Sequence, residues 1–259
     1  MKKCVVVSDS FKGTLSSGEI GRIAEEVIPR FFPDCQVVTI PVADGGEGTV
    51  ECFMSALRTG PVSVDVRDTN GQAVSAVYTR SGTKAVIEMA AAAGLPLAAA
   101  GSDPASTTTY GVGELMRHAV EHGCTEILLG LGGSATNDCG VGLAAALGFR
   151  FLDGAGEEVE PLAGNLGRME KIVPPEALPP LEVTAACDVD NPLTGPLGAT
   201  AVFGPQKGVT PELQPALEAG MAHMGALLEP LAGRPVARGP GRGAAGGLGA
   251  AGLAFLGGS

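Results

Sequence analysis

The sequence predicts an α/β protein built from two α/β domains, and three patterns support this prediction. The first 45 residues have the pattern of strand, helix and strand. The next stretch alternates apolar and polar residues, and a strand, a glycine-rich loop and a helix then follow each other. At 259 residues the chain is long for one domain. We therefore expect a first domain over residues 1–62 and a second over residues 63–259.

The first domain opens with a strand–helix–strand unit. Lys3 to Ser8 is a short run rich in β-branched residues, which predicts a buried strand. Ser16 and Glu19 then form the S-x-x-E pattern of a capping box, which predicts a helix running to about Arg30. Gln36 to Val42 is the second strand. A unit of this kind is expected to be right-handed, with parallel strands.

The stretch after this unit marks the change of domain. A helix is expected near Val50 to Leu57, and near Gly60 the pattern changes to alternating apolar and polar residues. Asp68-Thr69-Asn70-Gly71 has the composition of a hairpin turn. An antiparallel meander is therefore expected, with strands at residues 62–66, 74–79 and 84–89.

The remaining elements follow from hydrophobic periodicity. The apolar run Gly246 to Leu256 has almost no polar face, so we expect a helix there that is buried on several sides. Apolar residues at helical spacing and short apolar runs place the other elements. Further helices are expected at about 112–120, 141–147 and 211–231, and strands at 126–129 and 183–187.

Composition excludes several classes of partner. The net charge is −11 and the 17 Lys and Arg form no run, so a nucleic-acid partner is not expected. No apolar span is long enough for a membrane helix or a signal peptide, so no membrane partner is expected. None of the six cysteines forms a C-x-x-C pair, which is typical of reduced thiols in a cytoplasmic protein.

The run Gly130 to Gly142, GLGGSATNDCGVG, follows a strand and precedes a helix. Glycines let the backbone approach an anion, and a helix N-terminus offers free N–H donors. We interpret the run as an anion-binding loop of a small-molecule enzyme, with a kinase the favoured class. The alternative is a tight turn in which Asn137 or Asp138 caps the helix. The candidate nucleotide-binding residues are Gly132, Gly133, Ser134, Thr136 and Asn137, and Asp138 is a candidate Mg²⁺ ligand.

Other motifs compete with this interpretation. No G-x-x-x-x-G-K-[ST] string occurs in the chain. Gly130-x-Gly132-x-x-Ala135 and Gly241-x-Gly243-x-x-Gly246 fit dinucleotide fingerprints only weakly, which leaves a nicotinamide enzyme as an alternative. The segment GLGGSA also resembles the loop of the galactokinase–homoserine kinase–mevalonate kinase superfamily. His118 and His122 match a zinc pattern, H-x-x-E-H, but helical spacing places both on a solvated flank, so a polar helix face is the preferred explanation.

Charged loops follow the first two strands. Asp9-Ser10-Phe11-Lys12 comes after the first strand and Asp44 to Gly48 after the second. Both loops are expected at the same edge of a parallel sheet, where ligands bind. Asp188 directly follows a later strand, and Lys207 lies in another Gly-containing loop. The alternative for each is a solvated turn charge.

Eight segments spread along the whole chain carry a family pattern, in this order: SDSFKGTLSS, PVADGGEGTVE, IEMAAAAGL, GVGEL, GGSATNDCGVGLAAALG, ACDVDNPLTGPLGA, FGPQKG and GAAGGLGAAGLAFLG. Together they resemble the first family of glycerate kinases, the bacterial kind. The resemblance implies ATP-dependent phosphorylation of D-glycerate, with 2-phosphoglycerate the usual product. It also implies a flavodoxin-like domain and a mixed-sheet α/β domain, with the active site in the cleft between them.

The chain also departs from the family pattern. Members of the family continue further, so the resemblance implies that the C-terminal third is lacking and that the flavodoxin-like domain is incomplete. A non-catalytic fragment that only binds ligands is therefore the alternative function. Cys139 stands where a small residue such as glycine is usual, and we expect it to be tolerated.

Under this hypothesis the candidate residues divide into roles. Lys12, with Ser10 and the glycine backbone, holds the substrate carboxylate or a phosphate, and Lys207 neutralises charge on the transferred group. A carboxylate serves as base and another binds Mg²⁺, with Asp44, Asp138 and Asp188 not sorted between these roles. The expected ligands are ATP, Mg²⁺ and D-glycerate, and a homodimer is left open. The catalytic candidates are Lys12, Asp44, Asp188 and Lys207, the substrate-binding ones Asp9, Ser10, Gly45, Gly46 and Glu47, and the metal-binding ones Asp138 and Asp188.

Overall fold

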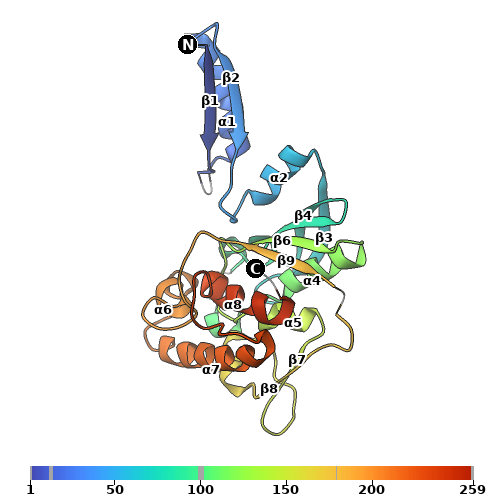
Figure 1. Ribbon diagram of the computed structural model, residues 1–259. Coiled ribbons are helices and arrows are strands. Elements are labelled where there is room, and N and C mark those ends of the chain that lie inside the picture. Colours follow the sequence, from blue (N-terminus) through green and yellow to red (C-terminus); the bar gives the residue numbers. More distant parts are fainter. Residues whose placement is uncertain (1, 12–13, 99–101, 179, 258–259) are drawn as a thin grey trace.

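The computed structural model describes residues 2–11, 14–98, 102–178 and 180–257 (Figure 1). Within these ranges the chain is a mixed α/β protein, as the sequence predicts. The strands are β1 (Lys3–Ser8), β2 (Gln36–Pro41), β3 (Pro61–Arg67), β4 (Ala73–Ser81), β5 (Lys84–Glu88), β6 (Glu126–Gly130), β7 (Arg150–Leu152), β8 (Lys171–Val173) and β9 (Glu182–Ala186). The α-helices are α1 (Ser17–Phe31), α2 (Thr49–Leu57), α3 (Ala90–Ala93), α4 (Tyr110–Glu121), α5 (Val141–Ala146), α6 (Ala199–Phe203), α7 (Gln214–Ala232) and α8 (Ala244–Leu256).

The first unit consists of β1, α1 and β2 and stands apart from the rest of the chain (Figure 1). Its two strands pair in parallel, with Lys3 opposite Gln36. The capping box is confirmed: the Ser16 hydroxyl accepts a hydrogen bond from the Glu19 N–H, and the Glu19 carboxylate accepts one from the Ser16 N–H. These two bonds satisfy donors that a helix start leaves unpaired, and they explain why α1 begins at Ser17.

The main sheet has the strand order β3-β4-β5-β6-β9. The first three strands pair antiparallel, and β5, β6 and β9 pair in parallel. The meander, the strand before the glycine-rich loop and the strand at 182–186 are therefore confirmed. Because β5, β6 and β9 run in the same direction, their carboxyl ends meet at one edge of the sheet, where the loops discussed below leave it.

Helices cover the main sheet on both faces (Figure 1). Alternate residues of a strand point to opposite faces, and β4 follows this rule. Tyr78 is buried and its hydroxyl lies 3.1 Å from Nδ1 of His118 on α4. The next residue, Thr79, hydrogen-bonds Thr59, which follows α2, on the other face. Helix α2 contacts β4 and β5, so it packs on the main sheet although it lies before the predicted boundary at residue 62, which stays a prediction.

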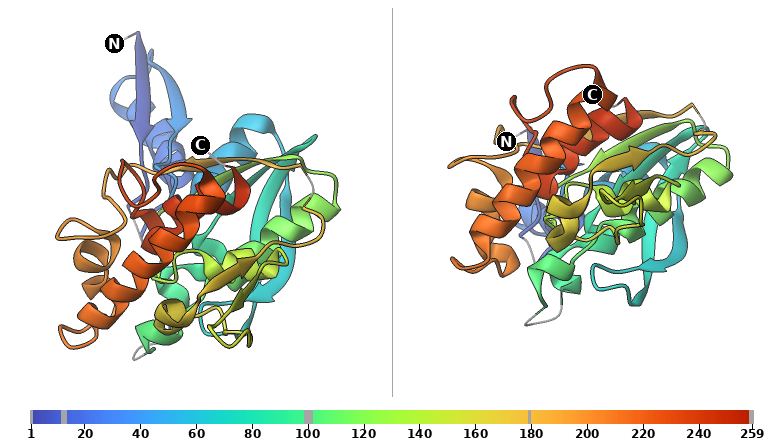
Figure 2. Two further views of the ribbon diagram at one scale, coloured as in Figure 1. Left: turned by 60° about the horizontal axis from the view of Figure 1, so that its bottom comes forward. Right: turned by 90° about the horizontal axis from the view of Figure 1, so that it is seen from below.

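The largest part of the core lies between the main sheet and helices α4, α5, α7 and α8. Helices α7 and α8 pack against each other on this side (Figure 2). The apolar helix α8 is buried on several sides, as expected, because its small residues pack closely and Phe255 contacts Phe149 and Phe151 edge to face. Among the described residues, no helix is long and apolar enough to cross a membrane.

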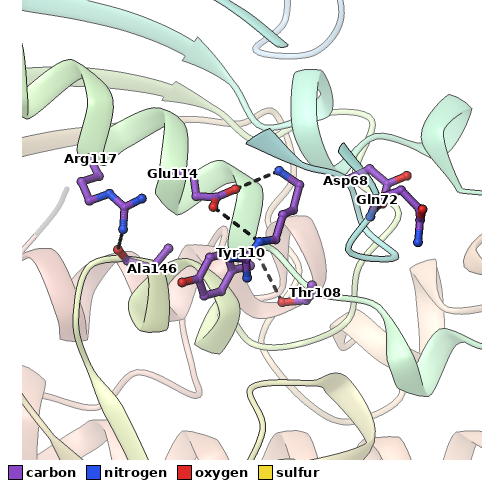
Figure 3. Close-up of polar contacts among 8 residues, drawn as sticks. Asp68, Gln72, Thr108, Tyr110, Glu114, Arg117 and Ala146 are labelled. Carbon is purple, nitrogen blue, oxygen red and sulfur yellow. Dashed lines mark hydrogen bonds and ion pairs between the residues drawn. The ribbon is translucent and has the colours of Figure 1, made fainter. Parts of the chain in front are cut away.

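Hydrogen bonds connect helix α4 to β3 on one flank and to the end of α5 on the other (Figure 3). Glu114 accepts a hydrogen bond from the Arg67 N–H of β3 at 2.8 Å, and Arg117 donates to the Ala146 carbonyl at the end of α5, at 3.2 Å. His118 is only partly exposed, since it contacts Tyr78 and stacks on His122 with ring centroids 4.0 Å apart. The expectation that both histidines lie on a solvated flank is therefore wrong for His118, because β4 covers that side of the helix.

Arg58 ends α2 in a left-handed conformation, with φ of 53°. Such a conformation is strained for any residue with a Cβ atom and is unstrained for glycine. We expect Arg58→Gly to raise the free energy of unfolding by about 0.5–1 kcal/mol, measured by urea denaturation. Arg58→Ala keeps the Cβ atom and is the control, with no gain expected. A glycine variant less stable than the wild type would contradict the assignment of strain to this residue.

Candidate active site

Loops from distant parts of the sequence meet at the carboxyl edge of the main sheet. The loop after β6 runs beside the Asp44–Gly48 loop, and the Gly132 N–H donates to the Gly45 carbonyl at 3.1 Å. The Leu131 N–H donates to the carbonyl of Ala186, the last residue of β9, at 3.0 Å. The fold therefore brings these segments to one place, although β2 belongs to a different sheet from β6 and β9.

Glycines are required where these loops touch, because backbone meets backbone. A Cβ atom on Gly45 would lie 2.5 Å from the Ala186 carbonyl oxygen, and one on Gly130 would lie 2.3 Å from the Gly45 carbonyl oxygen. A Cβ atom on Gly132 would lie 2.6 Å from the Cα of Gly46. Since real Cβ atoms do not approach other atoms so closely, a side chain at any of these positions would push the loops apart.

A small cavity of about 160 Å³ lies where the loops meet. It combines glycine backbone, one lysine and two carboxylates, so it offers both donors for an anion and acceptors for a cation or a proton. Its described lining consists of Asp44, Leu131, Gly132, Gly133, Ser134, Cys187, Asp188, Val189, Phe203, Gln206, Lys207, Ala244 and Ala245.

Lys207 is the buried cation of this cavity. Its Nζ donates to the Ser134 hydroxyl at 2.8 Å and to the Thr136 carbonyl at 2.6 Å. Burial lowers the pKa of Lys207 to about 7, while the negative charge of Asp138 acts in the opposite direction. The side chain is therefore held at the glycine-rich loop and is ready to take up a proton when an anion enters, so it is not the exposed turn lysine that the sequence left as an alternative.

The two carboxylates of the cavity differ in their engagement. Asp44 uses Oδ1 to accept the Gly46 N–H at 2.8 Å and so shapes its own loop. Asp188 is exposed at the cavity. Among the residues that the structure describes, it makes no hydrogen bond or ion pair. Asp188 is thus the carboxylate of the cavity that is not used to shape a described loop.

Asp138 is engaged by protein donors, and the metal role that the sequence suggested for it stays a prediction. It is fully buried, and its carboxylate accepts hydrogen bonds from the Thr109 N–H and hydroxyl and from the N–H groups of Gly140 and Gly142. Burial raises the pKa of Asp138, and these hydrogen bonds oppose the rise. Both carboxylate oxygens accept protein donors, so Asp138 ties the starts of α4 and α5 to the glycine-rich loop, and it is not in the described lining of the small cavity.

The end of the glycine-rich loop lies under the cavity and outside its described lining. Thr136 and Asn137 are buried, and the Asn137 amide donates to the Thr200 hydroxyl at 3.0 Å. Thr136 Oγ1 and Asn137 Oδ1 have no hydrogen-bond partner among the described residues. Gly132, Gly133 and Ser134 line the cavity directly. The predicted nucleotide-binding residues thus divide into a set that lines the cavity and a set that supports it.

Two of the remaining predicted residues line a larger cavity of about 580 Å³, between the first unit and α2. Ser10 and Glu47 line it. Asp9 is not in its described lining and accepts the Ser10 N–H at 2.7 Å. Lys12 lies outside the described residues.

The model of the glycerate kinase family matches residues 4–259. The chain belongs to the glycerate kinase family. It is 42% identical over 261 residues to the glycerate 2-kinase of Escherichia coli strain K12, covering 98% of this chain and 68% of the relative. It is also 42% identical over 260 residues to the glycerate kinase of Bacillus subtilis strain 168, covering 98% and 68%.

A solved structure supports the same relationship. The crystal structure of a Salmonella typhimurium LT2 protein assigned as glycerate kinase 2 superposes with a TM-score of 0.88 and 41% identity, over 99% of this chain and 70% of that one. The chain thus spans about two thirds of the length of its relatives and is an enzyme of the kinase class.

Two residues that sequence reasoning missed hold the loops of this glycerate kinase family site. The Glu88 carboxylate accepts the Val50 N–H and fixes the start of α2 behind the Asp44–Gly48 loop. The Thr109 hydroxyl donates to Asp138 and accepts the Leu143 N–H at 2.9 Å. Glu88 is the last residue of β5 and lies opposite Gly130 of the parallel strand β6. Its place at the carboxyl end of a parallel strand is therefore a signal that could have identified it. No local pattern indicates Thr109, because its partners lie far away in the sequence.

The start of α8 also contributes to the site. Ala244 and Ala245 line the small cavity. The chain there has three successive left-handed residues, Ala245, Gly246 and Gly247. A Cβ atom on Gly246 would lie 2.1 Å from the Thr136 carbonyl oxygen, so the second and third of these residues pack flat against the glycine-rich loop. Residues 241–246, which fit a dinucleotide fingerprint in the sequence, therefore contribute Ala244 and Ala245 to the lining of the small cavity.

Proposed function

We propose that this chain catalyses the ATP-dependent phosphorylation of D-glycerate, with 2-phosphoglycerate as the product. The observation that carries the proposal is the small cavity, where a buried lysine, two carboxylates and glycine backbone meet. Phosphoryl transfer depends on positioning and on charge neutralisation more than on covalent chemistry, and this cavity provides both. The names of the relatives indicate glycerate as the substrate. The name glycerate 2-kinase favours phosphorylation of the hydroxyl on carbon 2.

Each residue of the cavity has a role under this proposal. The backbone of Gly132 and Gly133 and the Ser134 hydroxyl bind phosphate oxygens, which suits a site that cannot rely on overall charge. Lys207, already bonded to Ser134, neutralises charge that develops on the transferred group. Asp188 takes the proton from the attacking hydroxyl, because its carboxylate makes no other bond among the described residues.

The residues present also fit a magnesium ion. Mg²⁺ in phosphoryl-transfer sites is bound by one or two carboxylates together with substrate phosphates, and Asp44 and Asp188 are carboxylates on one cavity. Among the described residues, no three His, Cys, Asp or Glu side chains form a group that could hold a metal ion by themselves. When bound, the ion would offset phosphate charge. We propose Asp44 as its main protein ligand.

The alternative, a non-catalytic ligand-binding module, is not favoured. A binding module needs no unengaged carboxylate beside a cation, whereas this cavity holds Asp188 and Lys207 together.

The six cysteines are free thiols, as the sequence predicted, and the cytoplasmic location and the homodimer stay predictions.

Replacement of Asp188 by Asn tests the proposed function. The amide cannot accept the proton, so we expect kcat for glycerate-dependent ADP release to fall by about 10²- to 10⁴-fold. Asp190→Asn is the matched control, since Asp190 is exposed on the same loop and does not line the cavity. Turnover of Asp188→Asn close to that of Asp190→Asn would contradict the assignment. The ³¹P spectrum of the product distinguishes 2-phosphoglycerate from 3-phosphoglycerate.

A further inference from the structure

The Asp44–Gly48 loop separates the small cavity from the larger one. Asp44 lines the small cavity, whereas Glu47 and Gly48 line the larger. Three residues of extended chain span at most about 11 Å, so the two cavities are close enough for one elongated ligand to span the distance between them. Their volumes differ, about 160 Å³ against about 580 Å³. Sites for whole organic ligands usually measure about 300–1,000 Å³, so the larger cavity is the one with room for a nucleoside.

Part of the described lining of the larger cavity is apolar. Phe11, Leu15, Met54 and Val77 line it. The Phe11 side chain is 61% exposed. An aromatic ring held at the mouth of a cavity offers a flat surface on which another ring can stack. A ligand that packs against these residues is therefore expected to have a flat apolar part.

Another part of the described lining of this cavity consists of carboxylates and hydroxyls. Glu47 and Glu51 line it, and among the described residues their carboxylates make no hydrogen bond or ion pair. The Ser10 Oγ, also in the lining, is buried and has no partner among the described residues. Glu19 and Glu88 line it too, but their carboxylates already accept backbone N–H groups.

These groups select a ligand with hydroxyl or amine donors and no negative charge at this end. Carboxylates repel a glycerate carboxylate or a phosphate, and among the described lining residues there is no Lys or Arg to offset them. The small cavity, with Lys207, suits those anions. A nucleoside has the required combination, since its base is flat and its ribose carries hydroxyl donors.

We infer that the larger cavity binds the nucleoside of the phosphoryl donor, while the phosphates reach past the Asp44–Gly48 loop into the small cavity. This inference rests on the proposed function. It assigns Ser10 and Glu47 to the nucleotide, where the sequence assigned them to glycerate. It also places the acceptor hydroxyl, with its three-carbon acid, in the small cavity beside Lys207 and Asp188.

Filling the larger cavity tests the inference. Met54→Trp adds bulk to its apolar lining, so we expect KM for ATP to rise at least about tenfold, with KM for D-glycerate nearly unchanged. Phe53→Trp is the matched control, since Phe53 is the preceding residue of α2 and lines a different hollow with Thr79 and Arg80. Phe11→Ala is a second variant, which removes an exposed ring and leaves the core intact. It is also expected to raise KM for ATP.

A binding measurement makes the test independent of turnover. In calorimetric titrations, Met54→Trp and Phe11→Ala are expected to weaken ADP at least about tenfold and to leave tripolyphosphate unchanged. An unchanged affinity for ADP, or a raised KM for glycerate with KM for ATP unchanged, would overturn the inference and leave the kinase activity standing. Absence of glycerate-dependent ADP release from the wild type would instead reject the proposed function, and the ADP titrations would still report on the cavity.

Discussion

Replacing Lys207 by Met is expected to lower kcat/KM for glycerate phosphorylation by about 10²- to 10³-fold, the usual effect of removing a positive group that stabilises developing charge. The side chain is buried, and Met keeps its unbranched shape at one heavy atom less, so the loss would come mainly from charge and from the bonds to Ser134 and Thr136. Lys171→Met, at an exposed lysine of β8, is the control. Activity of Lys207→Met within about twofold of that control would show that the buried cation takes no part in the reaction.

The same residue predicts a pH dependence of binding. In the free protein the pKa of Lys207 is about 7, so above that pH the side chain is neutral until an anion enters and raises its pKa. Nucleotide binding above pH 7 is then accompanied by proton uptake, which calorimetry in buffers of different ionisation enthalpy measures. Lys207→Arg stays charged and is expected to bind without this proton uptake. Equal proton uptake by both proteins would contradict the assignment to Lys207.

Lys207 also affects the stability of the free protein, and the sign follows from its protonation. Its pKa falls from 10.5 to about 7 on folding, so between these values the unfolded chain binds more protons than the folded protein. The Lys207 contribution to the free energy of unfolding therefore rises from pH 7 to 10.5 and is least favourable below pH 7. The stability gained by Lys207→Met is expected to be largest at low pH.

Replacing Asp138 by Ala is expected to lower the free energy of unfolding by about 3–5 kcal/mol. The change leaves buried donors of Thr109, Gly140 and Gly142 without an acceptor. Asp153→Ala is the control, since Asp153 accepts two backbone N–H groups in an exposed turn and its loss is expected to cost about 1 kcal/mol or less.

Removal of Mg²⁺ separates this structural role from a metal site. If Asp138 only accepts protein donors, EDTA leaves the urea midpoint of the free wild type unchanged. A lower midpoint in EDTA for the wild type, with no such change in Asp138→Ala, would support the metal role that the sequence suggested.

The sequence predicted most of the secondary structure because local signals specify it. The capping box at Ser16 and Glu19 marks the start of α1, and the turn at Asp68–Gly71 connects β3 and β4. The glycine-rich loop was recognised for the same reason, since a strand, glycines and a helix follow each other within a short stretch. The family resemblance then gave the class of enzyme, which the comparisons confirm.

Functions that depend on burial were not predictable from local patterns. Asp138 and Asp188 are the same type of residue, and both follow a strand. Asp138 accepts hydrogen bonds from buried protein donors, whereas Asp188 is exposed at a cavity. Lys207 has no sequence signal that distinguishes it from a turn lysine, because its burial depends on the glycine-rich loop that packs over it. His118 was misplaced for a related reason, since the strand that covers it comes from another part of the chain.

The contact between the Gly45 and Gly130 loops has a consequence for how sequences in this family can vary. Where two side chains touch, a larger residue on one side is often offset by a smaller one on the other, and the two positions change together. Here the atoms in contact are backbone on both sides, so no second substitution can make room for a first. We therefore expect only glycine at positions 45 and 130 among relatives. Paired substitutions at these two positions are not expected.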